Sequence, residues 1–326
     1  MQLVQRVQME SLGNHLFFAT LTYNELSLPR LFVSTGYDIP YFQISDLQNM
    51  FKRLRKQRAF GRPFRYLAVS ELGGKKGRPH AHVLFMVPRF RNDTFLDCLN
   101  LQDVMFKAVL HEWRRNSGST RAPVWSPLCT FVRRYVRGRL STNYDLHYCT
   151  ARSPGDSLAN VAFYVLKYML KRSDRETRLQ QALRLNLPPD EYDDVWSVVR
   201  SRYVASLGFG LAPSDGQSIS PVVYSYLRDC VRRSKDERLD YPCYWSPESG
   251  NQFPLSRYYR NDGRIYSYAD ALDFYLRKQD DRVDTVVDDS FISSDVWLKR
   301  IRDYERKLKQ TELDTFADGL FDDLPD

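Results

Sequence analysis

The stretch Gly77-Arg78-Pro79-His80-Ala81-His82-Val83-Leu84-Phe85-Met86-Val87 places two histidines one residue apart at the start of an apolar run. The run has the length and the β-branched content of a buried strand. Because successive side chains of a strand point to opposite faces, both imidazoles are expected on the same face of the sheet. This pattern indicates a metal site, although two polar residues at a solvated sheet edge would give the same pattern.

The residues just before this stretch predict a second strand that pairs with it. Residues 65–71 form the strand, and a turn rich in glycine and proline separates it from His80. In the resulting antiparallel hairpin, Glu71 at the end of one strand lies beside His80 and His82 at the start of the next. We therefore expect the Glu71 carboxylate to be the third ligand.

Composition favours a polyanionic partner. The chain has 326 residues, a formal net charge of +8 and an isoelectric point near 9.1, which suit either nucleic acid or a membrane surface. Its 21 tyrosines suit contact with exposed bases. The five cysteines are odd in number, widely scattered and without a Cys-x-x-Cys pair, which argues against a disulfide scaffold and a structural zinc finger and fits a reducing cytosol.

Targeting signals are not expected. No apolar run approaches the roughly 20 residues that span a bilayer, and the N-terminus lacks the apolar core of a signal peptide. The sequence also lacks the Gly-x-x-x-x-Gly-Lys-Ser/Thr motif of ATP-driven motors. We expect a soluble intracellular protein that does not associate with a membrane.

The remaining residues of the first half predict an α+β fold. Residues 16–23 form a strand, and a helix with apolar positions at helical spacing begins after Ser45. Residues 94–116 add one or two helices, and residues 131–137 and 144–150 add two strands. Four or five strands interleaved with helices give an antiparallel sheet flanked by helices.

Basic residues gather on two of these elements. They lie on the surface of the helix after Ser45 and along the strand at residues 131–137, where they suit contact with a phosphate backbone or are merely solvated. With Arg78, these are the candidate DNA-binding residues: Lys52, Arg53, Arg55, Lys56, Arg78, Arg133, Arg134 and Arg137.

A helix is predicted from Ser157 to about Arg172. At helical spacing Tyr164, Lys167, Tyr168 and Lys171 form one stripe, and apolar residues cluster on the opposite side. The stripe is either ordinary amphipathic surface or a functional pair of phenols, one turn apart, that can reach one point.

The second half predicts a separate organisation. Residues 1–175 form the core domain, residues 176–305 a mostly helical region, and residues 306–326 an acidic tail. Basic and aromatic residues alternate in the helical region, which suits single-stranded DNA, although packing of the tyrosines explains the pattern nearly as well.

Taken in order, these motifs resemble the HUH-superfamily rolling-circle replication initiators, and are most similar to those of the small single-stranded DNA phages, the microviruses. The resemblance rests on the strand ending Thr20-Leu21-Thr22, on Gly-Arg-Pro-His-Ala-His preceded by Glu71, and on the Tyr-x-x-Lys-Tyr-x-x-Lys helix. Arg257-Tyr258-Tyr259 after Phe253-Pro254 is similar to a downstream motif, with Ser256 in the place of a proline.

The resemblance implies an HUH nuclease core with an RRM-like sheet and the activity of a site-specific DNA endonuclease and strand transferase. Mn²⁺ or Mg²⁺ would bind to Glu71, His80 and His82, and the third ligand varies in the superfamily, with His147 as the alternative here. Tyr164 and Tyr168 would be the nucleophiles, with Lys167 or Lys171 stabilising the phenolate. The implied partners are single-stranded DNA at a phage-type origin and a host helicase and polymerase, in the bacterial cytoplasm.

Two other functions fit the same residues. Another HUH nuclease, a plasmid initiator or a transposase, would share the metal site and differ only in circularising a strand on a phage-type origin. A non-catalytic single-stranded DNA-binding or packaging protein would bind DNA in a salt-sensitive way, with no covalent adduct and no metal requirement.

Overall fold

A five-stranded antiparallel sheet forms the centre of the protein. In the computed structural model, residues 2–73, 77–119, 121–129, 134–136, 139–141, 144–148, 174–211, 219–247 and 250–280 are described. Contacts divide the chain after Phe274, so all but the last few described residues lie in one unit, Met1–Phe274. The strand order is β10 (Tyr144–Tyr148), β1 (Asn14–Thr22), β5 (Pro79–Pro88), β4 (Arg65–Leu72) and β11 (Tyr203–Ala205).

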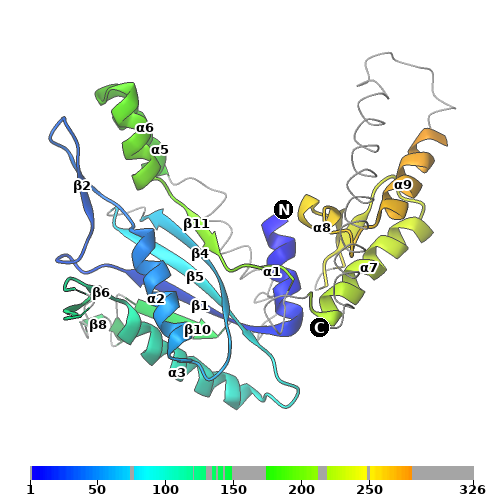
Figure 1. Cartoon of the computed structure of the whole chain (residues 1–326), viewed down its shortest axis with the longest axis horizontal. Helices are drawn as coiled ribbons and strands as arrows, with labels where there is room; N and C mark the ends of the chain where they lie inside the picture. The colour runs from blue at the N-terminus through cyan, green and yellow to red at the C-terminus, as the bar shows by residue number, and fades with distance from the viewer. Residues whose placement is uncertain are drawn as a thin grey trace, which may run out of the picture. The chain divides into compact units, whose positions relative to one another are not determined.

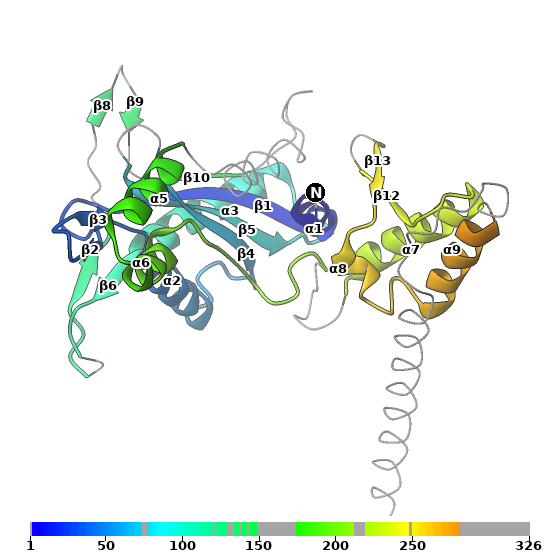
Figure 2. The same ribbon diagram turned by 90° about the horizontal axis from the view of Figure 1, so that it is seen from above.

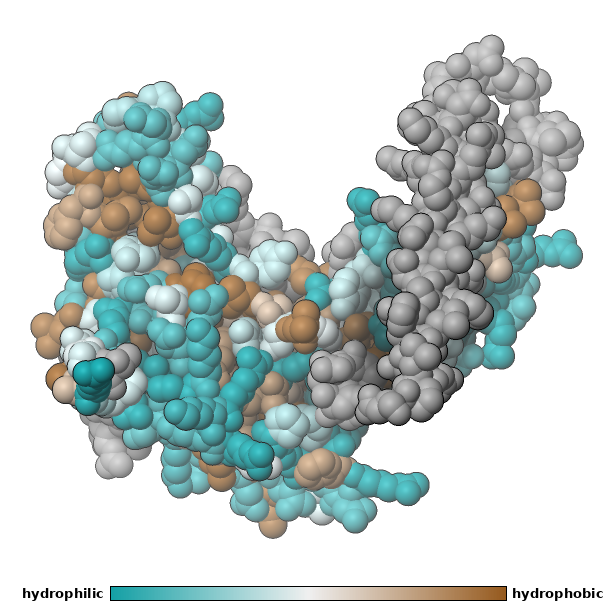
Figure 3. All heavy atoms as spheres, in the orientation of Figure 1, coloured by the Kyte–Doolittle hydropathy of each residue, from teal (hydrophilic) through white to brown (hydrophobic). Residues whose placement is uncertain are grey.

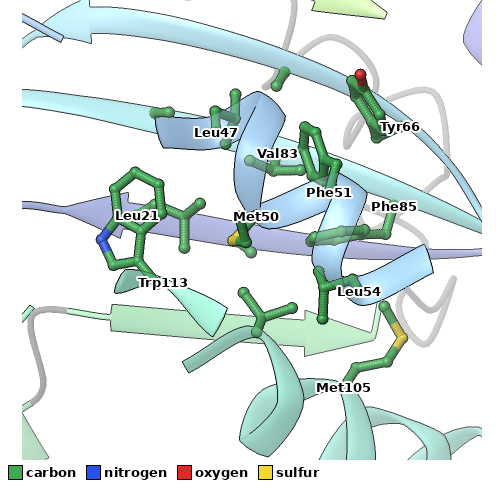
Figure 4. Packing of buried hydrophobic residues seen from close by; sticks show 14 of the residues in the cluster. Leu21, Leu47, Met50, Phe51, Leu54, Tyr66, Val83, Phe85, Met105 and Trp113 are labelled. Carbon is green, nitrogen blue, oxygen red and sulfur yellow. The ribbon is translucent and has the colours of Figure 1, made fainter. Parts of the chain in front are cut away.

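Two helices cover one face of this sheet (Figure 1). They are α2 (Ile44–Lys56) and α3 (Phe95–Glu112), and Thr94 and Asp97 form a capping box at the start of α3. The apolar stripe of α2 packs on Val83 and Phe85 of β5, as Figure 4 shows. The α+β fold predicted from the sequence, with an antiparallel sheet flanked by helices, is confirmed.

The opposite face is partly covered by α1 (Gln2–Gly13), a helix that the sequence analysis did not predict. Val4 and Val7 of α1 pack against Leu84 and Met86, the residues that follow His80 and His82 on the same face of β5. The two faces of β5 therefore bury apolar residues against different helices. Only the end of the strand that carries the histidines extends beyond this packing.

The sheet also takes a strand from beyond residue 175. β11 pairs antiparallel with β4, with Val204 opposite Ala68. It follows α5 (Asp174–Asn186) and α6 (Pro189–Val199), which pack on the hairpin of β2 (Arg30–Phe32) and β3 (Asp38–Pro40) (Figure 2). The domain division at residue 175 stays a prediction, and the sheet is built from both sides of it.

Helices predominate among the described residues of the C-terminal half. They are α7 (Pro221–Asp236), α8 (Arg257–Arg260) and α9 (Tyr268–Asp280), with one small hairpin of β12 (Cys243–Trp245) and β13 (Gln252–Pro254). Tyr259 is fully buried and donates a hydrogen bond to the Gly210 carbonyl at 2.9 Å. The Ser256 N–H donates to Gln5 Oε1 at 2.9 Å, a bond that the proline expected at this position could not make.

The other predicted elements have mixed outcomes. The strand at residues 144–150 is β10 of the sheet, whereas the strand at residues 131–137 is β8 (Arg134–Val136), which pairs only with β9 (Arg139–Ser141) in a separate hairpin. β6 (Arg114–Asn116) and β7 (Trp125–Pro127) form another. The predicted helix at 157–172 and the acidic tail lie outside the described residues. No helix in the described part of the chain is long and apolar enough to span a bilayer.

Candidate metal centre

The antiparallel register of the sheet brings the predicted ligands together. Glu71 on β4 lies directly opposite His80 on β5, and His82 lies opposite Thr20 on β1. Directly opposite residues point to the same face, so these four side chains share the face that α1 covers further along the strands. The hairpin predicted from the sequence, with Glu71 beside both histidines, is confirmed.

The ligand atoms converge on one point. Glu71 Oε1 lies 2.7 Å from His80 Nε2 and 3.3 Å from His82 Nε2. One ligand atom from each of the three residues lies within 4.8 Å of the other two. The side chains are 13%, 16% and 6% exposed, so the site is half sheltered and still open on one side. Such a cluster of one carboxylate and two imidazoles is compatible with a divalent metal ion.

The His80 ring shows that this donor set fits a cation. Its Nδ1 lies 3.1 Å from the Arg78 carbonyl, which can only accept, so Nδ1 carries a proton. Its Nε2 then faces another acceptor, Glu71 Oε1. Only a second proton or a metal ion between Nε2 and the carboxylate satisfies both atoms.

The pKa shifts follow from the same contacts. Burial alone would raise the pKa of Glu71, but hydrogen bonds from His80 and His82 outweigh it and lower that pKa. Burial alone would lower the pKa of His80, but the hydrogen bonds to Glu71 and to the Arg78 carbonyl outweigh it and raise that pKa. The carboxylate therefore stays ionised at neutral pH, as a metal ligand must.

Two residues of β1 hold the His82 ring. The Thr20 hydroxyl lies 3.2 Å from His82 Nδ1, and the Phe18 ring stacks on the imidazole with centroids 5.3 Å apart and planes at 17°. A partner on Nδ1 orients the ring so that Nε2 faces the metal position. The sequence analysis did not assign Thr20 this role, because the pairing of β1 with β5 spans some 60 residues and leaves no local signal.

The predicted catalytic residues cannot be compared with this geometry. Tyr164, Lys167, Tyr168 and Lys171 lie outside the described residues. The alternative ligand, His147, is paired with Phe18 on β10, and β1 separates β10 from the strand of His80 and His82. The backbone register thus brings Glu71, and not His147, next to the two histidines.

The predicted DNA-binding residues lie in several places. α2 packs on the face of the sheet opposite to the metal centre. There Arg53 Nε donates to Glu112 Oε2 at 2.7 Å, and Arg55 lies over the rings of Phe64 and Tyr66, while Lys52 and Lys56 are exposed.

The remaining candidates lie outside α2. Arg78 pairs with Glu25 at 2.6 Å beside the centre. Arg134 belongs to β8, and Arg133 and Arg137 lie outside the described residues. A DNA-binding role for each of the eight basic residues stays a prediction.

Comparison with known proteins points to DNA replication. Residues 16–173 match a family model described as a replication-associated protein of the ORF2 type. The matched segment contains β1, β4 and β5, which together carry the whole metal centre, and also the stretch with the paired tyrosines. No match was found among curated proteins or among solved structures. The match indicates a replication-associated protein.

Proposed function

We propose that this protein is a replication initiator that nicks single-stranded origin DNA through a tyrosine nucleophile with the help of a divalent metal ion. The observation that carries the proposal is the cluster of Glu71, His80 and His82 at the end of two paired strands. It lies within the segment that is similar to replication-associated proteins. A protein that only coats or packages DNA has no need for such a cluster.

Glu71, His80 and His82 would hold the ion. Two imidazoles favour Mn²⁺, and the carboxylate and the abundance of Mg²⁺ in cells favour Mg²⁺. A divalent ion at this position supplies positive charge beside the scissile phosphate and makes its phosphorus more electrophilic. The Thr20 hydroxyl and the Phe18 ring would keep the His82 imidazole in place.

Tyr164 and Tyr168 are the proposed nucleophiles. A tyrosine of pKa near 10 is only about 0.1% ionised at neutral pH, a handicap of roughly 4 kcal/mol that Lys167 or Lys171 would partly offset by stabilising the phenolate. The phenolate oxygen bonds to phosphorus as the bond from phosphorus to the 3′ oxygen breaks. The products are a 5′-phosphotyrosine and a free 3′-hydroxyl that primes synthesis.

A second tyrosine allows a second transfer. While one tyrosine holds the 5′ end from the first cut, the other would cut the regenerated origin, and the released 3′-hydroxyl would attack the first phosphotyrosine and close the strand into a circle. The energy of the phosphodiester is conserved in each step. This chemistry suits the origin of a small single-stranded DNA phage in the bacterial cytoplasm, with a helicase and a polymerase supplied by the host.

A labelled single-stranded oligonucleotide that carries a phage-type origin tests the proposal. With Mn²⁺ the wild-type protein should give a covalent adduct on a denaturing gel, and Tyr164→Phe/Tyr168→Phe should give none. Tyr203→Phe, at a tyrosine that is 60% exposed on β11, is the matched control and should behave as wild type. His80→Ala should lose the adduct and keep most of the DNA binding, because phosphate contacts come mainly from basic surfaces.

The opposite results would support a non-catalytic protein. If wild-type protein binds the oligonucleotide in a salt-sensitive way but forms no adduct with Mn²⁺ or Mg²⁺, the proposal fails. An adduct that persists in the double tyrosine variant would exclude these two nucleophiles.

A further inference from the structure

A cavity of about 340 Å³ lies next to the hairpin that carries the metal centre. Two residues of that hairpin line it, Leu72 and Gly77, and the rest of the lining comes from the β2–β3 hairpin and α5 (Figure 2). Leu72 directly follows Glu71, and consecutive side chains of a strand point to opposite faces. The cavity therefore begins one residue away from a metal ligand, around the end of β4.

The walls of the cavity are apolar and its edges are polar. Ile39, Leu72 and Leu183 are buried walls. Asp38 and Asn186 lie among the polar lining residues. Asn186 Nδ2 donates to the Ala182 carbonyl at 2.7 Å, which makes its amide oxygen the acceptor for a ligand. A cavity of this size is at the lower end of the range for ligand pockets and suits a flat heterocycle with apolar faces and polar edges.

Exposed aromatic side chains surround this part of the molecule. Tyr37, which also lines the cavity, is 59% exposed, and Phe32 on the same hairpin is 76% exposed. Figure 3 shows apolar residues gathered where the β2–β3 hairpin and α5–α6 meet. Exposed rings beside a basic chain are typical of surfaces on which the bases of a single strand stack.

We infer that this cavity binds one base of the single-stranded DNA close to the scissile phosphate. The inference rests on the proposed function for the path of the strand across the metal centre. The base inserts between the apolar walls, stacks on Tyr37 at the rim and offers an exocyclic amino group to the Asn186 amide oxygen. The cavity thereby fixes the register of the strand relative to Glu71, His80 and His82.

Filling the cavity tests the inference. Ala182 lines the cavity from the exposed side of α5, so Ala182→Trp places an indole where the base would bind. Leu185→Trp is the matched control, because Leu185 is on the same helix, is 85% exposed and does not line the cavity. Fluorescence anisotropy then measures the affinity of each full-length protein for a labelled 20-nucleotide oligothymidylate and for a fully abasic strand of the same length, with EDTA present to prevent cleavage.

Ala182→Trp should weaken binding of the oligothymidylate by about tenfold, within the roughly 5- to 150-fold that one stacked base is worth. Binding of the abasic strand should not change, and Leu185→Trp should match wild type with both strands. Tyr37→Ala, which removes a ring without filling the cavity, should weaken binding of the oligothymidylate alone. This second variant keeps the test valid if the tryptophan disturbs α5.

Equal affinity of wild type, Ala182→Trp and Tyr37→Ala for oligothymidylate would overturn the inference, as would a wild-type protein that binds both strands equally. A cavity that takes a free small molecule would give this equal affinity as well. The proposed function is judged separately, by the covalent adduct that wild-type protein forms with Mn²⁺. Failure of one result therefore leaves the other standing.

Discussion

The two imidazoles of the metal centre differ in how they are held. His80 Nδ1 donates to a main-chain carbonyl two residues earlier in its own strand, whereas the His82 ring depends on Thr20 and Phe18 of the neighbouring strand. A backbone contact survives most side-chain substitutions. The orientation of His82 is therefore the point at which a single substitution outside the ligand set can weaken metal binding.

Thr20→Val should lower the affinity for Mn²⁺ by roughly 10- to 100-fold, the usual effect of removing a hydrogen-bond partner of a metal ligand. Valine matches the shape of threonine and lacks only the hydroxyl that faces His82 Nδ1. Isothermal titration calorimetry measures the affinity, and Thr20→Ser, which keeps the hydroxyl, should restore most of it. Wild-type affinity in Thr20→Val would show that the hydroxyl does not position the ring.

A second polar cluster governs stability in acid. Asp93 accepts hydrogen bonds from both terminal nitrogens of Arg62, at 2.6 and 2.8 Å, and lies 2.9 Å from His15 Nε2. The Arg62 hydrogen bonds, helped by the Phe90 N–H and by His15, outweigh burial and hold the pKa of Asp93 well below its usual range. The ionised carboxylate therefore favours the folded state.

Asp93→Asn should lower the free energy of unfolding by about 3 kcal/mol at pH 6, because it leaves Arg62 without its anion. A carboxylate with a lowered folded-state pKa stabilises above its unfolded pKa, near 3.9, and loses that effect as pH falls. The difference from wild type should therefore shrink below about pH 4. Urea unfolding between pH 2.5 and 6 measures it, with exposed Asp103→Asn as control; a pH-independent difference would contradict this assignment.

At the scale of elements, local sequence patterns predicted what depends on near neighbours. The alternation in residues 65–71 and 79–88 and the short glycine-rich turn between them were sufficient to predict the hairpin and the meeting of Glu71 with His80. The helical spacing of Leu47, Met50 and Phe51 likewise predicted α2 and its buried stripe. The strand at residues 131–137 was predicted, but not its place, because nothing within it distinguishes an isolated hairpin from a sheet strand.

Phe51→Ala should lower the free energy of unfolding by about 3–5 kcal/mol, the usual cost of emptying a packed aromatic site. The Phe51 ring is buried and stacks on Tyr66 at a centroid distance of 3.6 Å. Urea denaturation measures the loss, and the exposed neighbour Lys52→Ala should stay within about 0.5 kcal/mol of wild type.

The same variant tests the separation of the two faces. Since α2 packs on the face opposite to the metal centre, folded Phe51→Ala protein should bind Mn²⁺ with wild-type affinity. A large loss of metal affinity at a temperature where the variant is fully folded would show that the two faces are coupled.

At the scale of the whole molecule, long-range pairings could not be predicted from local patterns. α1 and β11 come from near the N-terminus and from beyond residue 200, and both complete the sheet around residues 65–88. The Arg257-Tyr258-Tyr259 motif is also explained only by the tertiary structure, since Tyr259 is buried against Gly210 and Arg6 lies over the Tyr258 ring at 4.1 Å. These contacts depend on which distant segments meet, which neither periodicity nor spacing reveals.

Glu10→Ala should lower the free energy of unfolding by about 3–5 kcal/mol, because it leaves a buried guanidinium unpaired. Glu10 is fully buried, and its carboxylate accepts from Arg65 Nη2 at 2.6 Å and from the Gly210 N–H at 2.7 Å, which ties α1 to β4 and to the segment after β11. Glu25→Ala, at an exposed ion pair, should cost less than about 1 kcal/mol. Urea denaturation compares them, and equal losses would contradict the special role of Glu10.

The most direct test of the proposed function is the identity of the residue that becomes joined to DNA. Wild-type protein is incubated with single-stranded origin DNA and Mn²⁺, the adduct is digested with nuclease and protease, and tandem mass spectrometry locates the nucleotide. We predict a 5′-phosphotyrosine linkage at Tyr164 or Tyr168, formed only with a divalent ion and absent from His82→Ala. A nucleotide on any other residue, or an adduct that forms in EDTA, would contradict a metal-assisted attack by this pair of tyrosines.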